Sequence, residues 1–396
     1  MFQFWLHNLP GVGDRTIEKL LGRFGSPREV YSAGQGALEE VLGNARALSV
    51  LAFRKTFQLQ CAYEEMLDKK IIFCTKEDEN YPQRLKEITH PPYGLYCLGN
   101  LPENQRPAAA IIGARECSEY GRAMAEAFAG RLGGAGVSIV SGMARGIDGI
   151  GQKAALTKGG KTYAVLGCGV DVCYPASNRQ LYEEITEKGG GILSVFPPGT
   201  QPLKQHFPER NRIVAGLSDL ILVVEARQKS GTWITVDMAL EQGKSVYAVP
   251  GRLTDRLNDG CNLLIRQGAG IALSPDDILA ELVVIRNRNG GRKEETKKAA
   301  AHPLVAAPVR TKSAEKAAPK TGADMTKEAE TKEEAAKTEG ILRFLDYHPK
   351  SADEILESME KAGIKISLPQ LLNELINLCM EGRAKQVTGN YFIRKE

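Results

Sequence analysis

The feature that most constrains the fold is an alternation of short apolar runs and helical patterns between residues 108 and 267. Each apolar run is hydrophobic along its whole length, as strands buried on both faces of a parallel sheet are. Right-handed connections between such strands place helices on both faces of the sheet. The sequence therefore predicts a doubly wound, Rossmann-like α/β domain with a mostly parallel sheet.

Glycine-rich segments follow predicted strands and lead into predicted helices. They are Gly113-Ala-Arg115, Ser141-Gly-Met-Ala-Arg-Gly-Ile-Asp148 and Gly167-Cys-Gly-Val-Asp171. Glycine lets backbone amides approach an anion, and a helix N-terminus favours negative charge. Because the carboxyl ends of parallel strands share one edge of the sheet, these turns predict a phosphate-binding crevice. The alternative is that the glycines only permit close packing of helices on strands.

The segment Phe207-Pro-Glu-Arg-Asn-Arg212 adds an aromatic ring and two cations, and Lys204 precedes it. A ring at this position can stack on a base while the lysine contacts a phosphate, and stacking contributes about 1–3 kcal/mol per base. This combination favours a nucleic-acid strand over a small cofactor. The alternative is that Phe207 seals the edge of the sheet and that Arg210 or Arg212 pairs with a carboxylate inside the fold.

The predicted DNA-binding residues are those that the turns and helix starts bring to the crevice. They are Gly113, Arg115, Ser141, Gly142, Gly146, Lys204, Phe207, Arg210, Arg212 and Gly231. Gly231 opens a helix whose first N–H groups can hold a second phosphate. Asp148 is either a catalytic carboxylate or a residue that caps the next helix and fixes its loop, and we favour the second role. We expect no catalytic residue, no metal and no cofactor.

Composition limits the other possibilities. The chain of 396 residues is long enough for several domains, and its formal charge of +4 is too small to indicate a nucleic-acid binder by itself. Its 8 cysteines form no C-x-x-C pair, so the spacing argues against zinc. No apolar run is long enough for a membrane helix, and the first residues do not resemble a signal peptide. We therefore expect a cytoplasmic protein with no membrane partner.

Changes in pattern along the chain predict its domain organisation. The predicted domains are a helical, helix-hairpin-helix-like (SAM-like) domain at 1–70, the Rossmann-like DNA-binding domain at 71–286, a flexible linker at 287–337 and a winged-helix domain at 338–396. The linker is rich in Ala, Lys, Glu and Thr and has no apolar period, so it cannot offset the entropy of ordering.

Each flanking domain leaves a choice open. Leu9-Pro-Gly-Val-Gly13 either holds a DNA backbone through main-chain N–H groups or is an ordinary packing hairpin, and Asp14 is expected to cap the helix that follows. In the C-terminal domain, Ser351-Ala-Asp-Glu354 has the spacing of a capping box. The helix expected over Leu368–Met380 contains no basic residue. A protein contact is therefore favoured over reading of duplex DNA.

With these motifs in order between residues 80 and 251, the chain resembles the DNA-processing protein A family, DprA, also called Smf. The strings that carry the resemblance are Asn80-Tyr-Pro-Gln-Arg-Leu85, Ile112-Gly-Ala-Arg115, Val140-Ser-Gly-Met-Ala-Arg-Gly-Ile-Asp148, Gly167-Cys-Gly-Val-Asp171, Tyr174-Pro175, Phe207-Pro-Glu-Arg-Asn-Arg212, Val224-Glu-Ala226, Ser230-Gly231 and Val249-Pro-Gly251.

The resemblance implies a non-catalytic, single-stranded DNA-binding protein of natural transformation. Such proteins protect incoming DNA, form homodimers and load the RecA recombinase. It also implies that Arg115 grips a phosphate, that Lys204 supplies a cation and that Phe207 stacks on a base. The rival hypothesis is a nucleotide hydrolase of the lysine-decarboxylase-like Rossmann group. Those enzymes use a Gly-Thr-x-x-Glu string, whereas Thr235 stands in this chain where the glutamate is expected.

Overall fold

A computed structural model describes residues 1–299, 342, 344–345, 350–362, 364, 366–381, 383–387 and 391–394. The chain divides into two compact units, Met1–Leu304 and Val305–Glu396. Each unit has its own hydrophobic core in the part of the chain that is described. The predicted boundary at residue 70 falls inside the first unit and stays a prediction.

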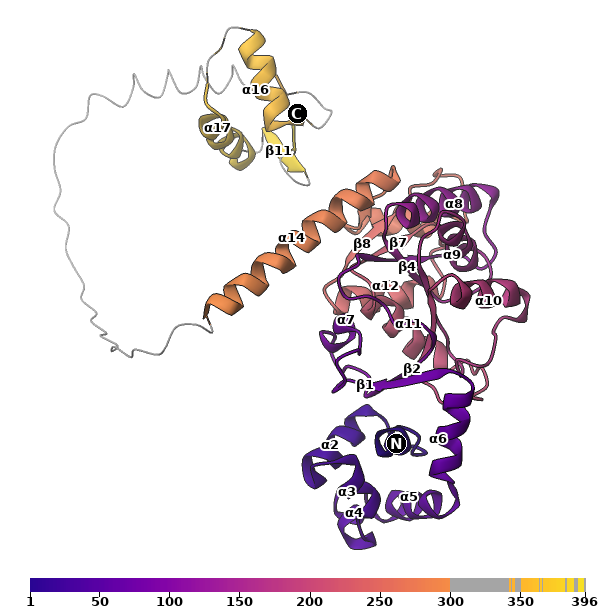
Figure 1. Ribbon diagram of the computed structural model, residues 1–396. Helices are drawn as coiled ribbons and strands as arrows, with labels where there is room; N and C mark the ends of the chain where they lie inside the picture. The colour runs from indigo at the N-terminus through magenta and orange to yellow at the C-terminus, as the bar shows by residue number, and fades with distance from the viewer. Residues whose placement is uncertain are drawn as a thin grey trace, which may run out of the picture. The chain divides into compact units, whose positions relative to one another are not determined.

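A 9-stranded sheet forms the centre of the first unit (Figure 1). Its strands are β1 (Ile71–Thr75), β2 (Gly94–Gly99), β3 (Ala108–Ile112), β4 (Ser138–Ser141), β5 (Thr162–Val165), β6 (Gly191–Ser194), β7 (Leu220–Val223), β8 (Ser245–Ala248) and β9 (Gly270–Ile271). They lie in the order β1-β2-β6-β5-β4-β3-β7-β8-β9. All pairs from β6 to β9 are parallel, so the predicted mostly parallel sheet is confirmed.

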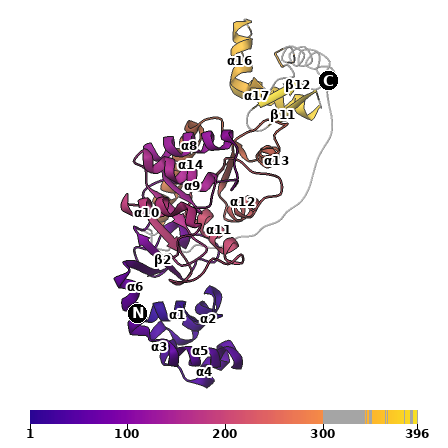
Figure 2. The same ribbon diagram turned by 90° about the vertical axis from the view of Figure 1, so that its right-hand side faces the viewer.

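Helices surround this sheet on both faces. They are α7 (Gln83–Lys86), α8 (Glu119–Gly134), α9 (Ile147–Thr157), the short η1 (Ala176–Asn178), α10 (Arg179–Glu187), α11 (His206–Gly216), α12 (Thr232–Glu241), α13 (Asp259–Arg266) and α14 (Pro275–Ala299). Figure 2 shows α8, α9, α10 and α14 on one side and α11, α12 and α13 on the other. Alternate residues of β3 enter the two cores: Ile111 packs with α8 and α9, and Ile112 packs with α11 and α12.

The order in which the strands are built creates a switch point. Strand β3 pairs with β4 on one side and with β7 on the other. The chain adds β4, β5 and β6 outward from β3, and α11 then leads back to β7 on the opposite side. Doubly wound sheets bind ligands at such a point, outside the carboxyl ends of the strands.

Strand β2 follows Pro91 and Pro92, which usually end regular structure, so the local sequence does not indicate it. The segment nevertheless pairs antiparallel with β1 and β6, with Tyr96 opposite Ser194. Tyr96 is completely buried. The strand is therefore stabilised by tertiary pairing and burial, which its short, glycine-flanked sequence does not reveal.

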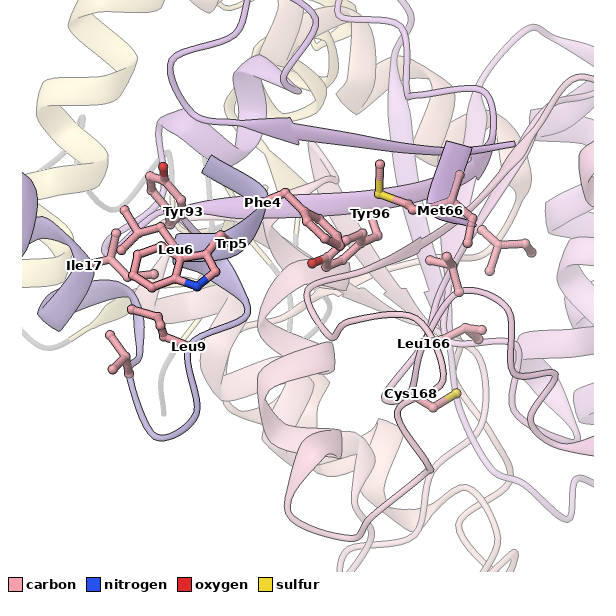
Figure 3. Packing of buried hydrophobic residues seen from close by; sticks show 14 of the residues in the cluster. Phe4, Trp5, Leu6, Leu9, Ile17, Met66, Tyr93, Tyr96, Leu166 and Cys168 are labelled. Carbon is pink, nitrogen blue, oxygen red and sulfur yellow. The ribbon is translucent and has the colours of Figure 1, made fainter. Parts of the chain in front are cut away.

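The chain begins with helices α1 (Phe2–His7), α2 (Asp14–Phe24), α3 (Pro27–Ser32), α4 (Gln35–Leu42), α5 (Asn44–Thr56) and α6 (Leu59–Asp68). Their core is continuous with residues of the sheet: Figure 3 shows Phe4 of α1 beside Tyr96 of β2. Asp14 does not cap α2, because Gly13 occupies the N-cap position. The Asp14 carboxylate instead accepts a bond from the Tyr93 N–H at 3.0 Å and ties α2 to the segment before β2.

The predicted linker is too long at its beginning, because α14 continues to Ala299. Residues 300–337 lie outside the described part of the chain. Within the described residues, no helix is long and apolar enough to cross a membrane.

The second unit contains β10 (Lys350–Ser351), α16 (Ala352–Lys361), α17 (Leu368–Met380), β11 (Ala384–Val387) and β12 (Tyr391–Arg394). The capping box at Ser351 and Glu354 is confirmed. Strands β11 and β12 pair antiparallel, and β10 joins the outer side of β12. The turn residues 388–390 of this hairpin lie outside the described residues.

Candidate nucleic-acid interface

A cavity of about 650 Å³ lies at the switch point of the sheet, beside the carboxyl ends of β3, β4 and β7. The predicted site residues that line it are Gly113, Arg115, Gly142, Lys204, Phe207, Arg210 and Gly231. An adjoining cavity of about 290 Å³ shares Arg115, Gly142, Phe207 and Arg210 with it and reaches Gly167. The crevice predicted from the glycine turns therefore exists as a physical hollow.

The turn after β3 places Arg115 at the rim of the cavity. The Ala114 N–H donates to the Glu225 carbonyl at 2.8 Å, which fixes the turn against the end of β7. A Cβ at Gly113 would lie 2.8 Å from that same carbonyl. Gly113 is therefore required for close packing as well as lining the cavity. The Arg115 side chain is exposed, and no hydrogen bond or ion pair engages it within the described residues.

The loop after β4 forms a second wall. Its Gly142 N–H donates to the Asp148 carboxylate at 3.1 Å, so Asp148 fixes the loop as predicted, although Gly146 is the N-cap of α9. Met143 in this loop has a positive φ of 53°. A residue other than glycine in this conformation is strained, and neighbouring contacts must hold it.

Phe207 lies in the first turn of α11 between two guanidinium groups. The Arg115 Cζ is 5.5 Å from the centroid of the ring, and the Arg210 Cζ is 5.6 Å from it. Both distances are within the range of cation–π attraction. The ring is half-buried and lines both cavities. Phe207 therefore offers an aromatic surface where two cations converge.

Arg210 is a buried cation at the base of both cavities, with a relative exposure of 6%. Its Nη1 lies 3.9 Å from the Asp148 carboxylate and 3.5 Å from the Val165 carbonyl, and its Nε has no partner among the described residues. Burial lowers the pKa of Arg210 and raises the pKa of Asp148, and their attraction partly opposes both shifts. A buried donor with an open position is suited to an anion in the cavity.

Lys204 and Gly231 complete the rim. Lys204 is exposed, and its ammonium group has no partner within the described chain. Gly231 is the N-cap of α12, and Ser230 beside it has a buried hydroxyl without a hydrogen-bond partner in the described residues. The N-terminus of α12 borders the cavity, since Gly231 and Thr232 both line it. These groups can accept a second phosphate.

Three predicted residues are not brought into either cavity. Ser141 is completely buried, and its hydroxyl donates to the Ile111 carbonyl at 2.6 Å. Gly146 has a φ of 75°, and a Cβ there would lie 2.2 Å from the Ala114 carbonyl, so this glycine permits two loops to cross. Arg212 turns away from the cavities and contacts Glu209 and the carbonyl of His90. The alternative weighed from the sequence, a carboxylate partner inside the fold, applies to Arg210, which pairs with the buried Asp148, whereas the partner Glu209 of Arg212 is half-buried.

Two residues that the sequence did not single out contribute to the site. Tyr174 lines both cavities, and its ring centroid is 6.0 Å from that of Phe207. Asn178 donates from its amide to the carbonyls of Met143 and Ala144 at 2.9 and 3.3 Å. No sequence signal connects Asn178 with a loop that lies more than 30 residues earlier, whereas Tyr174 belongs to the Tyr-Pro string after a glycine turn.

The hairpin turn Leu9–Gly13 lines a separate cavity of about 1100 Å³ together with Arg212 and His90. It therefore lies apart from the residues around Phe207. Whether it also contacts DNA stays a prediction. Among the described residues, no group of His, Cys, Asp and Glu side chains is arranged to hold a metal ion.

The model of the family described as DNA recombination-mediator protein A matches residues 72–283, which contain the whole sheet except the first residue of β1. The chain belongs to this family. DNA processing protein DprA of Streptococcus pneumoniae is 46% identical over 204 residues, covering 52% of this chain and 72% of that protein. Protein Smf of Synechocystis is 36% identical over 300 residues, covering 74% and 75%.

A solved structure agrees with this membership. The X-ray structure of DNA processing protein A from Streptococcus pneumoniae superimposes with a TM-score of 0.62 at 37% sequence identity, covering 71% of this chain and 97% of that one. The resemblance inferred from the motifs is therefore confirmed, together with the α/β fold. The cavity at the switch point lies within the matched region.

Proposed function

We propose that this protein binds single-stranded DNA in the cavity between β3 and β7, with phosphates on the amide-rich turns and Arg115 and a base against Phe207. The observation that carries the proposal is the convergence of an aromatic ring, two exposed cations and a buried guanidinium on one open cavity. Backbone and charge contacts of this kind do not read bases, so binding should be nearly independent of sequence and should weaken with salt.

A double substitution of Arg115 and Lys204 by alanine tests this proposal. Both side chains are exposed, and neither makes a hydrogen bond or ion pair within the described residues, so the variant should keep the unfolding temperature of the natural protein. Hydrogen bonds to charged groups contribute about 1.5–3 kcal/mol each, so affinity for single strands should fall at least about 100-fold. Unchanged retention of the DNA in a gel-shift assay would remove the assignment.

A matched control is available at the opposite edge of the sheet. Lys158 directly follows α9 there, and Arg266 is the last residue of α13. Both side chains are exposed, and within the described residues no hydrogen bond or ion pair engages their charged groups. The double variant Lys158→Ala, Arg266→Ala removes the same charge. It should bind single strands as the natural protein does.

We further propose that the site performs no chemistry on its ligand. Asp148 is the one carboxylate that lines the cavity within the described residues, and it is already engaged by Gly142 and Arg210. Thr235 also lines the cavity, where a hydrolase would need a glutamate, and a hydroxyl is not a general acid or base at neutral pH. Release of free base from nucleoside monophosphates, followed by chromatography, would favour the hydrolase instead.

The family's description as a recombination mediator supports a role in handing the bound strand to RecA. The protein should accelerate the onset of the DNA-dependent ATPase of RecA on single strands covered by a single-strand-binding protein. A variant that cannot bind DNA should not accelerate this onset. If the protein binds DNA well but does not accelerate the onset of the RecA ATPase, the loading role alone is contradicted.

A homodimer is the proposed assembly. Ile271 on the edge strand β9, Leu273 after it and Val283 on α14 are 50%, 76% and 58% exposed. Contiguous exposed apolar side chains are characteristic of interfaces, and we propose that these three form part of one. Sedimentation should give a dimer, and Leu273→Glu should shift it toward the monomer. A natural protein that sediments as a monomer at all concentrations would contradict this proposal.

A further inference from the structure

Exposed cations follow four neighbouring strands at their carboxyl ends, and they extend beyond the cavity. They are Arg145 after β4, Arg115 after β3, Arg227 and Lys229 after β7, and Arg252 and Arg256 after β8. Within the described residues, no hydrogen bond or ion pair engages any of these charged groups. We call this set the crest row.

The topology arranges the crest row in a line. Strands β4, β3, β7 and β8 are adjacent in this order, and each neighbouring pair is parallel. The loops that follow parallel strands emerge at one edge of the sheet. Neighbouring strands are about 4.8 Å apart, so the row spans roughly 14 Å from β4 to β8. The cations therefore continue in one direction from the cavity, past β7 and onto β8.

The loop after β7 is fixed on α13. The Gln228 N–H donates to the Asp259 carboxylate at 2.9 Å, and the Gly260 N–H donates to the Ala226 carbonyl at 2.9 Å. A Cβ at Gly260 would lie 2.6 Å from that carbonyl. The backbone that carries Arg227 and Lys229 is thus held in place, while the charged ends of these side chains extend into solvent.

The loop after β8 is held in the same manner. The Asn262 amide bonds both the N–H and the carbonyl of Gly251, at 3.1 and 3.0 Å, and the Asp255 carboxylate accepts the Leu257 N–H at 2.9 Å. The carboxylates of Asp255 and Asp259 thus accept hydrogen bonds from backbone N–H groups and do not pair with the arginines. Between Arg252 and Arg256, the side chain of Leu253 is 93% exposed and offers an apolar surface.

We propose that the DNA strand does not end in the cavity but continues over the loops after β7 and β8, with phosphates on the outer cations of the crest row and a base against Leu253. This inference rests on the proposed function. A line of spaced cations that do not converge suits the repeated phosphates of one strand, whereas a small anion requires converging donors. The exposed acid on these loops is Glu116, beside Arg115, so the outer half of the row carries an excess of positive charge.

The double variant Arg252→Gln, Arg256→Gln tests the proposal, with fluorescence anisotropy on oligothymidylates of about 4 and about 16 nucleotides, which span the usual range of site sizes. Affinity for the long strand should fall about 5- to 30-fold, and affinity for the short strand should not change. Because about 0.7 counterions are released per phosphate on single strands, the salt slope for the long strand should decrease by about 1.4.

The control is Lys158→Gln, Arg266→Gln, which removes the same charge at the opposite edge of the sheet. It should leave both affinities unchanged. If the crest variant binds both lengths with the affinity of the natural protein, or if both lengths are weakened equally, the extended path is overturned while the cavity site stands. A natural protein that binds neither strand overturns the proposed function itself, so the two failures are distinguishable.

Discussion

The guanidinium of Arg210 occupies the space that a side chain at position 142 would need. A Cβ built on Gly142 would lie 1.2 Å from the Arg210 Nη1, and the two residues come from the loop after β4 and from α11. The buried position of the Arg210 guanidinium therefore depends on the absence of a side chain at Gly142.

Gly142→Ala should displace either the guanidinium or the loop. Because Arg210 cannot remain buried beside a new methyl group, we expect a loss of about 1–3 kcal/mol in the free energy of unfolding, as for other overpacked positions. Affinity for single strands should fall as well. Urea unfolding and anisotropy measure the two effects. Gly231→Ala is the matched control, since no atom lies within 4 Å of a Cβ there. Equal stability of the two variants would contradict the assigned packing.

Phe207→Ala should weaken DNA binding by the contribution of one stacked base. The expected loss is about 1–3 kcal/mol, which corresponds to a roughly 5- to 150-fold change in affinity. Phe207→Tyr keeps an aromatic face and should restore binding. If the alanine and tyrosine variants bind alike, the ring does not stack on a base.

Asn178→Ala should reduce DNA binding although the residue lines neither the cavity nor its rim. The amide holds the carbonyls of Met143 and Ala144, and each such bond contributes about 0.5–1.5 kcal/mol. Without it, the strained loop can relax and move Gly142 from Arg210. Gln180→Ala in the adjoining helix α10 is the control, because its amide donates to Glu184 instead. The prediction is contradicted if both variants bind DNA equally well.

Stability should decrease below about pH 6.5 because of His7. Its Nε2 lies 2.9 Å from the Val195 carbonyl, its Nδ1 is buried without a partner in the described residues, and burial lowers the pKa of the ring. The unfolded chain takes up a proton near pH 6.5, whereas the folded ring stays neutral until its lower pKa. Stability is therefore complete above the unfolded pKa and is lost as the pH falls toward the folded one.

His7→Gln should flatten this dependence in urea unfolding between about pH 5 and 7. The contribution of the neighbouring Asp14 to stability has the opposite pH dependence. Burial raises the pKa of its carboxyl, so this contribution is lost as the pH rises. Asp14→Asn separates the two groups. If the free energy of unfolding is constant from about pH 5 to 7 in both the natural protein and the His7 variant, the role of the ring is contradicted.

Much of the fold follows from local patterns, and the parts that do not have physical reasons. Apolar strands and glycine turns predicted β3 to β8 and the edge where the cavity lies. Strand β2 was not predicted, because its burial comes from pairing with β6. Helix α11 begins at His206 although Pro208 follows, since proline is tolerated in a first helical turn, where its missing N–H has no partner to lose.

The helical period also explains why Arg212 does not line the cavity with the other predicted residues of α11. Phe207 and Arg210 are three positions apart and share one face of α11, whereas Arg212, two positions further, points away from Arg210. Gly146 and Ser141 belong to the motif strings but serve loop crossing and strand packing. A motif identifies residues that occur together, and only the fold separates those that line a cavity from those that support it.

Photo-crosslinking tests the central claim most directly. An oligonucleotide that carries 5-iodouracil, bound to the full chain and irradiated, should crosslink to the peptide that contains Phe207, and the Phe207→Ala variant should lose this product. Crosslinks confined to the hairpin turn at Leu9–Gly13 or to the second unit, with the Phe207 peptide unmodified, would contradict the account.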